Sequence, residues 1–414
     1  MIKTRMNVVY ASNIKLLFRR LGPFMGLIAI FAAGVFLNGS TFLNLYNQLN
    51  VLGRISIIAL PAVGMTLVIL TAGIDLSVGS MVSLSSVVCA MLLMERTWTK
   101  ATSIAVPVFV FLCLVIAFTL TKRFLRRHIS NSKVVSLFSL IVGSSIGFMV
   151  FLLMSRQVAT GFKTLTVLLV VPVLGLGLGT LTGAVIAKGK IQPFIVTLGM
   201  MSGAVGLAKF IAGKGGQIHP IYYQATGYTA EGTTQMAPQS FDMLSGKIAL
   251  FGMDLFPITG LFFLAAVLIV HFILTRLRLG RHIYAIGGNE LTARLSGVRV
   301  ERVKILVYGI SGGLSALAGV LYCASYTQGK PDAGATWELD AIAAVVIGGT
   351  SLMGGRGTVL GTMVGVLILG YLSNILNLQE VPSEVQDILK GIIIIGAVLL
   401  QEGAVVRWFR RLKK

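Results

Sequence analysis

Apolar runs of about 20 residues recur along almost the whole chain, separated mostly by short polar segments. A helix of that length crosses a hydrocarbon core of roughly 30 Å, and only helices and closed barrels satisfy their backbone groups within lipid. The pattern therefore predicts an all-α fold: a polytopic helical membrane protein with about 12 transmembrane helices. We place the spans near residues 22–38, 53–71, 76–94, 102–121, 134–153, 165–187, 191–211, 255–275, 303–325, 337–354, 357–376 and 387–404.

Composition supports a membrane protein without a sizeable soluble domain, because 55% of the residues are hydrophobic and only 12% are charged. We expect a cytoplasmic N-terminal segment over 1–21, one transmembrane domain over 22–404 and a basic cytoplasmic tail over 405–414. The three cysteines lie within apolar runs and have neither metal-site nor disulfide spacing. We therefore expect no metal and no cofactor.

The net charge of +21 is distributed unevenly between the segments expected on the two sides of the membrane. With the N-terminus inside, the inner segments hold 25 of the 35 Lys and Arg residues and 4 of the 14 acids, which leaves the outer segments neutral. Basic residues concentrate in cytoplasmic loops of membrane proteins, so the basic balance indicates orientation and not nucleic-acid binding. We expect both termini and the segment 276–304 to be cytoplasmic, and the long loop 213–254 to be external, where it is either a docking site for an external partner or disordered.

Glycine is abundant within the apolar runs, and several glycines repeat every four residues, a spacing that lets helix backbones approach closely in lipid. The run GLGLG at 175–179 belongs to this class, because it lacks the strand and the acid of a dinucleotide site. Two apolar runs, 64–79 and 348–365, are each broken by polar residues and glycines. Such paired interruptions indicate an internal repeat, as in many transporters.

Four acidic or polar residues beside these breaks are candidates for the pathway or its gate: Asp75, Ser77, Glu338 and Asp340. Carboxylates at membrane depth are functional hypotheses by default. Asp75, however, stands directly before an apolar helix, where its side chain can cap free backbone N–H groups, and this structural interpretation is favoured. Glu338 and Asp340 open another span and are interpreted in the same way. Trp98, Trp337 and Trp408 fall near predicted membrane boundaries, as interfacial anchors do.

Four motifs occur in the order found in one family. They are GMTLVILTAGIDLSVGSM at 64–81, AKGKIQPFIVTLGMM at 187–201, GRHIYAIGGNELTARLSGVRVERVK at 280–304 and ELDAIAAVVIGGTSLMGGRGTVLGTMVG at 338–365. Together they resemble the permease subunit of the ribose/galactose/xylose-type carbohydrate ABC importers, whose binding-protein-dependent systems lie in the bacterial cytoplasmic membrane. The resemblance covers roughly 50–94 and 165–404. It departs at the spans 102–121 and 134–153, which form an extra hairpin relative to a ten-span core.

The resemblance implies a permease, not an enzyme, that imports a monosaccharide by alternating access. Its implied partners are ATP-binding subunits, an extracytoplasmic sugar-binding protein and a second permease copy or homologue. No Gly-Lys pair in the chain has the rest of a P-loop, so ATP is expected to bind the partner subunit. The implied coupling helix, a short polar run closed by glycine, includes Asn289, Glu290, Ala293, Arg294 and Gly297. Glu290 and Arg294 are four residues apart and can pair on one helix face.

Other functions stay open at this point. Related permeases carry branched-chain amino acids or nucleosides. From a different class, an ion-coupled secondary transporter would use Asp75. A channel or a structural membrane protein is disfavoured by the ordered polar segment at 280–302.

Overall fold

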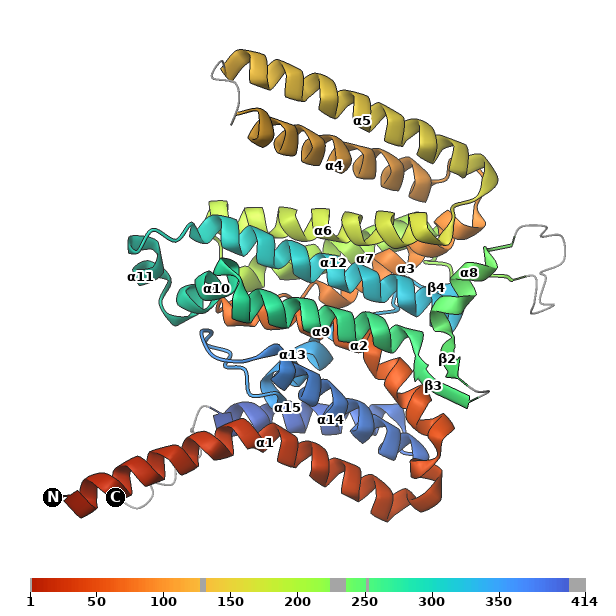
Figure 1. Cartoon of the computed structure of the whole chain (residues 1–414). Helices are drawn as coiled ribbons and strands as arrows, with labels where there is room; N and C mark the ends of the chain where they lie inside the picture. Colours follow the sequence, from red (N-terminus) through yellow and green to blue (C-terminus); the bar gives the residue numbers. More distant parts are fainter. Residues whose placement is uncertain (1, 127–131, 224–235, 251–252, 402–414) are drawn as a thin grey trace.

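The computed structural model describes residues 2–126, 132–223, 236–250 and 253–401, and most of its long helices lie side by side along one direction (Figure 1). The all-α, polytopic architecture is therefore confirmed. The first seven helices are α1 (Ile2–Leu43), α2 (Leu45–Leu70), α3 (Val78–Met94), α4 (Lys100–Leu125), α5 (Ser132–Thr160), α6 (Thr164–Gly189) and α7 (Pro193–Ala212). The later ones are α8 (Gln239–Asp242), α9 (Ile258–Arg276), α10 (Arg278–Gly288), α11 (Glu290–Leu295), α12 (Val300–Tyr326), α13 (Trp337–Ile347), α14 (Val359–Leu378) and α15 (Ser383–Gln401).

Each of the twelve predicted spans coincides with a helix, and nine helices of the described residues are long and apolar enough to cross a membrane. The span predicted near 337–354 is wrong as a continuous helix. Its helix α13 has 11 residues, about 16 Å at 1.5 Å per residue, which is too short for the hydrocarbon core. The glycine-rich segment 348–358 ends it, and Gly349 and Gly354 have positive φ angles of 86° and 82°.

The protein core lies around α2 and α12. In α2 and α12, 78% and 67% of the most apolar window is buried within the protein, against 22% in α4 and in α5. The hairpin of α4 and α5 lies at the side of the bundle beyond α6 (Figure 1). The hairpin predicted over 102–153 is thus peripheral, and its large hydrophobic side chains face outward.

Small residues allow α6 and α12 to pack closely, as the four-residue glycine spacing predicted. A Cβ on Gly175 or Gly179 would overlap the backbone of α12 at Gly312 and Tyr308. The backbones therefore approach too closely for any side chain between them. This contact fixes α6 against α12, the core helix that follows α11 in the chain.

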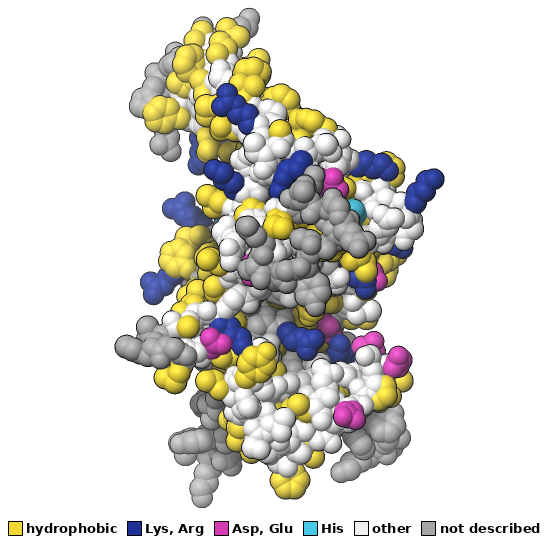
Figure 2. Space-filling view, turned by 90° about the vertical axis from the view of Figure 1, so that its right-hand side faces the viewer, with side chains coloured by type: hydrophobic (Ala, Val, Ile, Leu, Met, Phe, Trp, Pro, Cys, Tyr) yellow, Lys and Arg dark blue, Asp and Glu magenta, His cyan; other side chains and the backbone are white. Residues whose placement is uncertain are grey.

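Short strands and helices form one end of the molecule, and α10 and α11 lie at the opposite end, on the same side of the view as the beginning of α1 (Figure 1). Figure 2 views the first of these ends, where basic and acidic side chains lie together across the surface. Part of the long loop 213–254, including Glu231, is outside the described residues. The elements of this end are the antiparallel pairs β1 (His219–Pro220) with β4 (Gln328–Gly329) and β2 (Lys247–Leu250) with β3 (Met253–Pro257), and the 3₁₀ turn η2 (Met243–Ser245).

Candidate functional site

The helix α11 is short because side chains and glycine fix both of its ends. Asn289 is the N-cap, and its Oδ1 accepts the backbone N–H of Thr292 at 2.9 Å. Gly297, with a φ of 84°, follows the last turn and donates its N–H to the carbonyl of Arg294 at 3.0 Å. The left-handed termination predicted at Gly297 is confirmed. The predicted polar helix is therefore a separate, ordered element.

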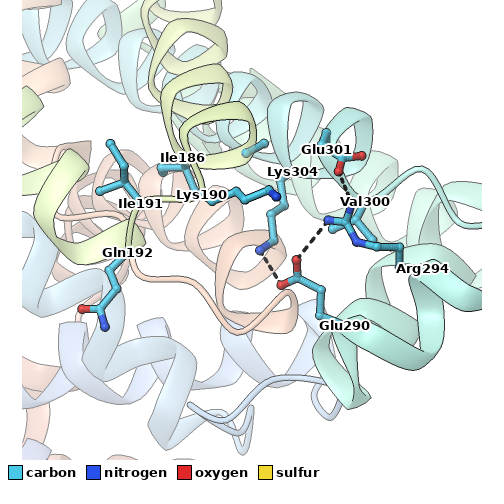
Figure 3. Close-up of a pocket in the computed structure, with 10 residues that line it drawn as sticks. Ile186, Lys190, Ile191, Gln192, Glu290, Arg294, Val300, Glu301 and Lys304 are labelled. Atoms are coloured by element: carbon cyan, nitrogen blue, oxygen red, sulfur yellow. Dashed lines mark hydrogen bonds and ion pairs between the residues drawn. The ribbon is translucent and has the colours of Figure 1, made fainter.

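Glu290 and Arg294 pair with each other, as their spacing predicted, and both also bind α12 (Figure 3). The Arg294 Nη2 lies 3.6 Å from Glu290 Oε1, and its Nη1 binds Glu301. Lys304 Nζ lies 2.7 Å from Glu290 Oε2. Half-exposed ion pairs contribute only about 0.2–1 kcal/mol each, so their main effect is to set the orientation of α11 against α12.

A groove of about 480 Å³ lies beside these ion pairs. The end of α6 contributes Lys190, whose left-handed backbone (φ 52°) terminates that helix, and the next residues lead into α7. The groove is lined on one side by Ile186, Lys190, Ile191 and Gln192 and on the other by Glu290, Arg294, Val300, Glu301 and Lys304 (Figure 3). The groove therefore joins three segments that the sequence alone did not place together.

Ala293 does not lie on the open surface of α11, because only 4% of it is exposed. The coupling role expected of Ala293 stays a prediction, and the side of this short helix that faces solvent is the opposite one. The large hydrophobic residues that α11 exposes are Leu291 and Leu295, with 66% and 81% exposure. They are four residues apart and share a helix face. That spacing was visible in the sequence, but which face was buried was not.

A close junction connects α10 to the two broken helices. The Leu70 carbonyl at the end of α2 accepts the backbone N–H of Gly355 at 3.0 Å. Gly287 of α10 lies against both groups, so that a Cβ there would overlap them. The Tyr284 hydroxyl donates to the Gly357 carbonyl at 2.8 Å, and burial raises the pKa of that hydroxyl. The interruptions predicted over 64–79 and 348–365 therefore meet at one place.

Asp75 lies in the break between α2 and α3 and is 2% exposed. Its Oδ1 accepts the backbone N–H of Ser77 at 3.0 Å and the Ser77 hydroxyl at 2.6 Å. Its Oδ2 accepts the Ser311 hydroxyl of α12 at 2.9 Å. The interaction with a backbone N–H that the sequence favoured is present, although Ser77 is the N-cap and α3 begins at Val78.

Glu338 and Asp340 lie in the first turn of α13, where the helix dipole favours carboxylates. The N-cap of that helix is Thr336. The Glu338 carboxylate reaches the N-terminal end of α3 beside Gly79. Asp340 turns to α15, where its carboxylate oxygens lie 3.4 and 3.5 Å from Lys390 Nζ. The expected capping role of Asp340 is therefore replaced by an ion pair between helices.

Residues 47–398 match the family model described as the branched-chain amino acid transport system / permease component. No solved structure matches the chain.

Named relatives cover most of the chain. It is 36% identical over 359 residues to the ribose import permease protein RbsC of Escherichia coli (strain K12), with 87% of this chain and 86% of that protein aligned. It is 36% identical over 382 residues to the protein of the same name from Bacillus subtilis (strain 168), with 92% of each aligned. The xylose transport system permease protein XylH of Escherichia coli (strain K12) is 33% identical over 390 residues, covering 91% and 90%.

Proposed function

The chain belongs to the branched-chain amino acid transport system / permease component family, and we propose that it is the membrane-spanning permease subunit of an ATP-driven, binding-protein-dependent importer of a monosaccharide. It is a transporter component with many membrane-spanning helices. The sugar substrate, the partner subunits and the orientation in the membrane belong to the proposal.

The relatives support a sugar as the substrate. The family description names branched-chain amino acids, but the relatives aligned over about nine-tenths of their length are named for ribose and xylose. Because the family description names amino acids, an amino acid permease is the alternative within the family. The two substrates differ in what they require of a site: a neutral sugar needs hydroxyl-matching groups, while an amino acid needs two opposite counter-charges.

The observation that carries the ATP-driven mechanism is α11. It is a capped, short helix that stands at one end of the bundle and exposes Leu291 and Leu295. Burying a leucine side chain contributes about 1.5–3 kcal/mol, so the pair supplies most of the affinity for a grooved partner. That partner is the ATP-binding subunit, and the ion pairs of Glu290 and Arg294 hold α11 in position for it.

Movement of α11 reaches the bundle by two connections. One is the set of ion pairs to α12, through Glu301 and Lys304. The other is α10, whose Gly287 lies against the end of α2 and against Gly355. Because both breaks meet at α10, closure of the ATPase subunits would shift the two broken helices together. This is the step that would open and close the pathway in alternating access.

The charge distribution supports an orientation with α10, α11 and both termini in the cytoplasm. The end with β2 and β3 then faces outward, where an extracytoplasmic sugar-binding protein delivers its substrate. A second permease copy or homologue completes the pathway as a dimer. The bacterial cytoplasmic membrane is the location.

A secondary transporter that uses Asp75 is the weaker candidate. Both carboxylate oxygens of Asp75 accept hydrogen bonds from Ser77 and Ser311, and the residue is buried. A proton or ion site needs a carboxylate that can change partners during the cycle. Asp75 instead joins the break after α2 to α12.

The test is uptake in proteoliposomes that contain the permease, its partner ATP-binding subunit and the sugar-binding protein. We expect D-ribose or D-xylose to accumulate when ATP is supplied on the side of the membrane where the ATPase lies. Accumulation should persist when ion gradients are collapsed. Leucine is the competing substrate. Uptake of leucine and of neither sugar would favour the amino acid alternative. Sugar accumulation by the permease alone on a proton gradient would replace the proposal by secondary transport.

A further inference from the structure

A second cavity, of about 250 Å³, lies between α2, α13, α14 and α15 and is separate from the groove beside α11. Its polar lining residues come from four helices: Arg54, Asp340, Ser373, Asn374, Asn377 and Lys390. Arg54 is the tenth residue of α2, directly after Gly53, which contacts Pro257 at the end of β3. The cavity therefore lies in the half of the bundle that carries the strands.

Charged side chains at this depth indicate a water-accessible path, because ionisable groups within membrane helices almost always face the bundle interior or a polar cavity. Asp340 and Lys390 form an ion pair whose side chains are 15% and 23% exposed. Arg54 forms no ion pair with any residue that the structure describes, and its side chain is exposed beside the cavity. Its guanidinium thus keeps its hydrogen-bond donors available.

Aromatic rings form another part of the wall. Tyr326 and Trp337 line the cavity, and Tyr322 contacts both, with ring centroids 4.5 Å from Tyr326 and 6.0 Å from Trp337. Trp337 was expected to be an interfacial anchor, but it lies where the loop before α13 enters the bundle. Aromatic faces pack well on the C–H faces of sugar rings, while amide and hydroxyl groups bind the sugar hydroxyls.

From this geometry we propose that the cavity is a transit site for one neutral monosaccharide ring, held between Trp337 and the side chains of Arg54 and Ser373. This inference rests on the proposed function and assigns the imported sugar a binding site within the permease. The volume admits one ring, since a cavity of roughly 150 Å³ already holds benzene. An amino acid zwitterion would require a free carboxylate for its ammonium group, and Asp340 is already paired with Lys390.

Transport by the complete system gives the first test. We expect Trp337→Ala and Arg54→Gln each to lower the rate of D-ribose or D-xylose uptake about tenfold or more, because the first removes an aromatic wall of the cavity and the second removes a charged hydrogen-bond donor. ATP hydrolysis stimulated by the binding protein should persist. Trp98→Ala and Arg156→Gln are the matched controls, since both residues are exposed outside the cavity, and they should retain wild-type uptake.

Cysteine labelling gives the second test. Ser373→Cys, in a variant whose three cysteines are replaced by alanine, should react with an impermeant maleimide from outside, and millimolar D-ribose or D-xylose should slow the reaction severalfold. Wild-type uptake by both cavity variants, without protection of position 373, would overturn the transit site while leaving the importer intact. Absence of sugar uptake by the wild type would instead refute the proposed function.

Discussion

The Lys304 ammonium lies 2.7 Å from the Glu290 carboxylate and thereby joins the first residue of α11 to the second turn of α12. The same carboxylate faces Arg294, which in turn binds Glu301. Four charges therefore alternate in sign along the contact between the two helices. The contact supports a fixed angle between the exposed helix and the membrane-spanning one.

Removing either charge of the Glu290–Lys304 pair should uncouple ATP hydrolysis from uptake. We expect Glu290→Gln and Lys304→Gln each to lower sugar uptake per ATP hydrolysed about two- to fivefold, which corresponds to the modest energy of a half-exposed pair. The double variant should be no worse than Glu290→Gln alone, because Glu290→Gln already removes the ion pair with Lys304 together with the one with Arg294. Lys188→Gln is the control, since Lys188 is exposed at the end of α6. Additive losses in the double variant would show that the two residues act separately.

The exposed leucines should determine assembly with the ATPase. Replacing Leu291 and Leu295 together by serine should reduce co-purification of the ATPase at least about tenfold, because each buried leucine is worth roughly 1.5–3 kcal/mol. Membrane insertion should be unchanged. Met243→Ser, a 64% exposed residue at the opposite end, is the matched control. Full co-purification by the double leucine variant would place the ATPase contact elsewhere.

Gly287 and Gly288 allow the effect of an added methyl group to be compared between a closely packed position and an open one. Gly287→Ala should destabilise the protein by about 1–3 kcal/mol, because the added methyl group overlaps Leu70 and Gly355. Uptake should fall with it, since this junction connects α10 to both breaks. Gly288→Ala has open space around the added methyl group and should behave as wild type. Thermal unfolding in detergent and uptake measure the difference, and equal behaviour of the two variants would contradict the junction's role.

The sequence predicted the helices well because each apolar run is long and bounded by polar residues. It predicted an interruption over 348–365 but still extended the span to residue 354, and did not place the end of α13 at Ile347. The exact end depends on the backbone conformation at Gly349 and Gly354. The charge pattern also could not reveal that Arg54 and Lys390 line a common cavity. Both were counted with the outer charges, since depth in the bundle is a tertiary property.

The resemblance to the carbohydrate ABC importers implied the candidate coupling residues, and their local pattern predicted the polar helix closed by Gly297 and the pairing of Glu290 with Arg294. It did not distinguish the buried side of α11 from the exposed side. Ala293 is buried, and Leu291 and Leu295 are exposed. A six-residue helix has too few positions for periodicity to identify its buried face.

Asp75 should matter for stability and not for proton coupling. Asp75→Ala removes the acceptor of three hydrogen bonds and leaves Ser311 without its partner, so we expect the melting temperature in detergent to fall by several degrees. Asp75→Asn keeps one acceptor oxygen, so its melting temperature should fall less. ATP-driven uptake by the wild type should continue after the proton gradient is collapsed. Loss of that uptake, with ATP maintained, would assign Asp75 or another group to ion coupling.

The orientation of the bundle can be tested at two exposed positions at opposite ends. Ser296→Cys follows α11, and Met243→Cys lies in η2, in a background whose three native cysteines are replaced by alanine. The concentration of basic residues at the α11 end predicts that this end is cytoplasmic.

We therefore expect an impermeant maleimide to label the Met243→Cys variant in intact cells and to label the Ser296→Cys variant only after the membrane is permeabilised. Neither substitution removes a buried side chain or a residue assigned to coupling, so both variants should still take up sugar, which verifies that they are correctly inserted. Labelling of position 296 from outside in a transporting variant would invert the topology. Since an ATPase works on the cytoplasmic side, such a result would also exclude α11 as the site where it binds.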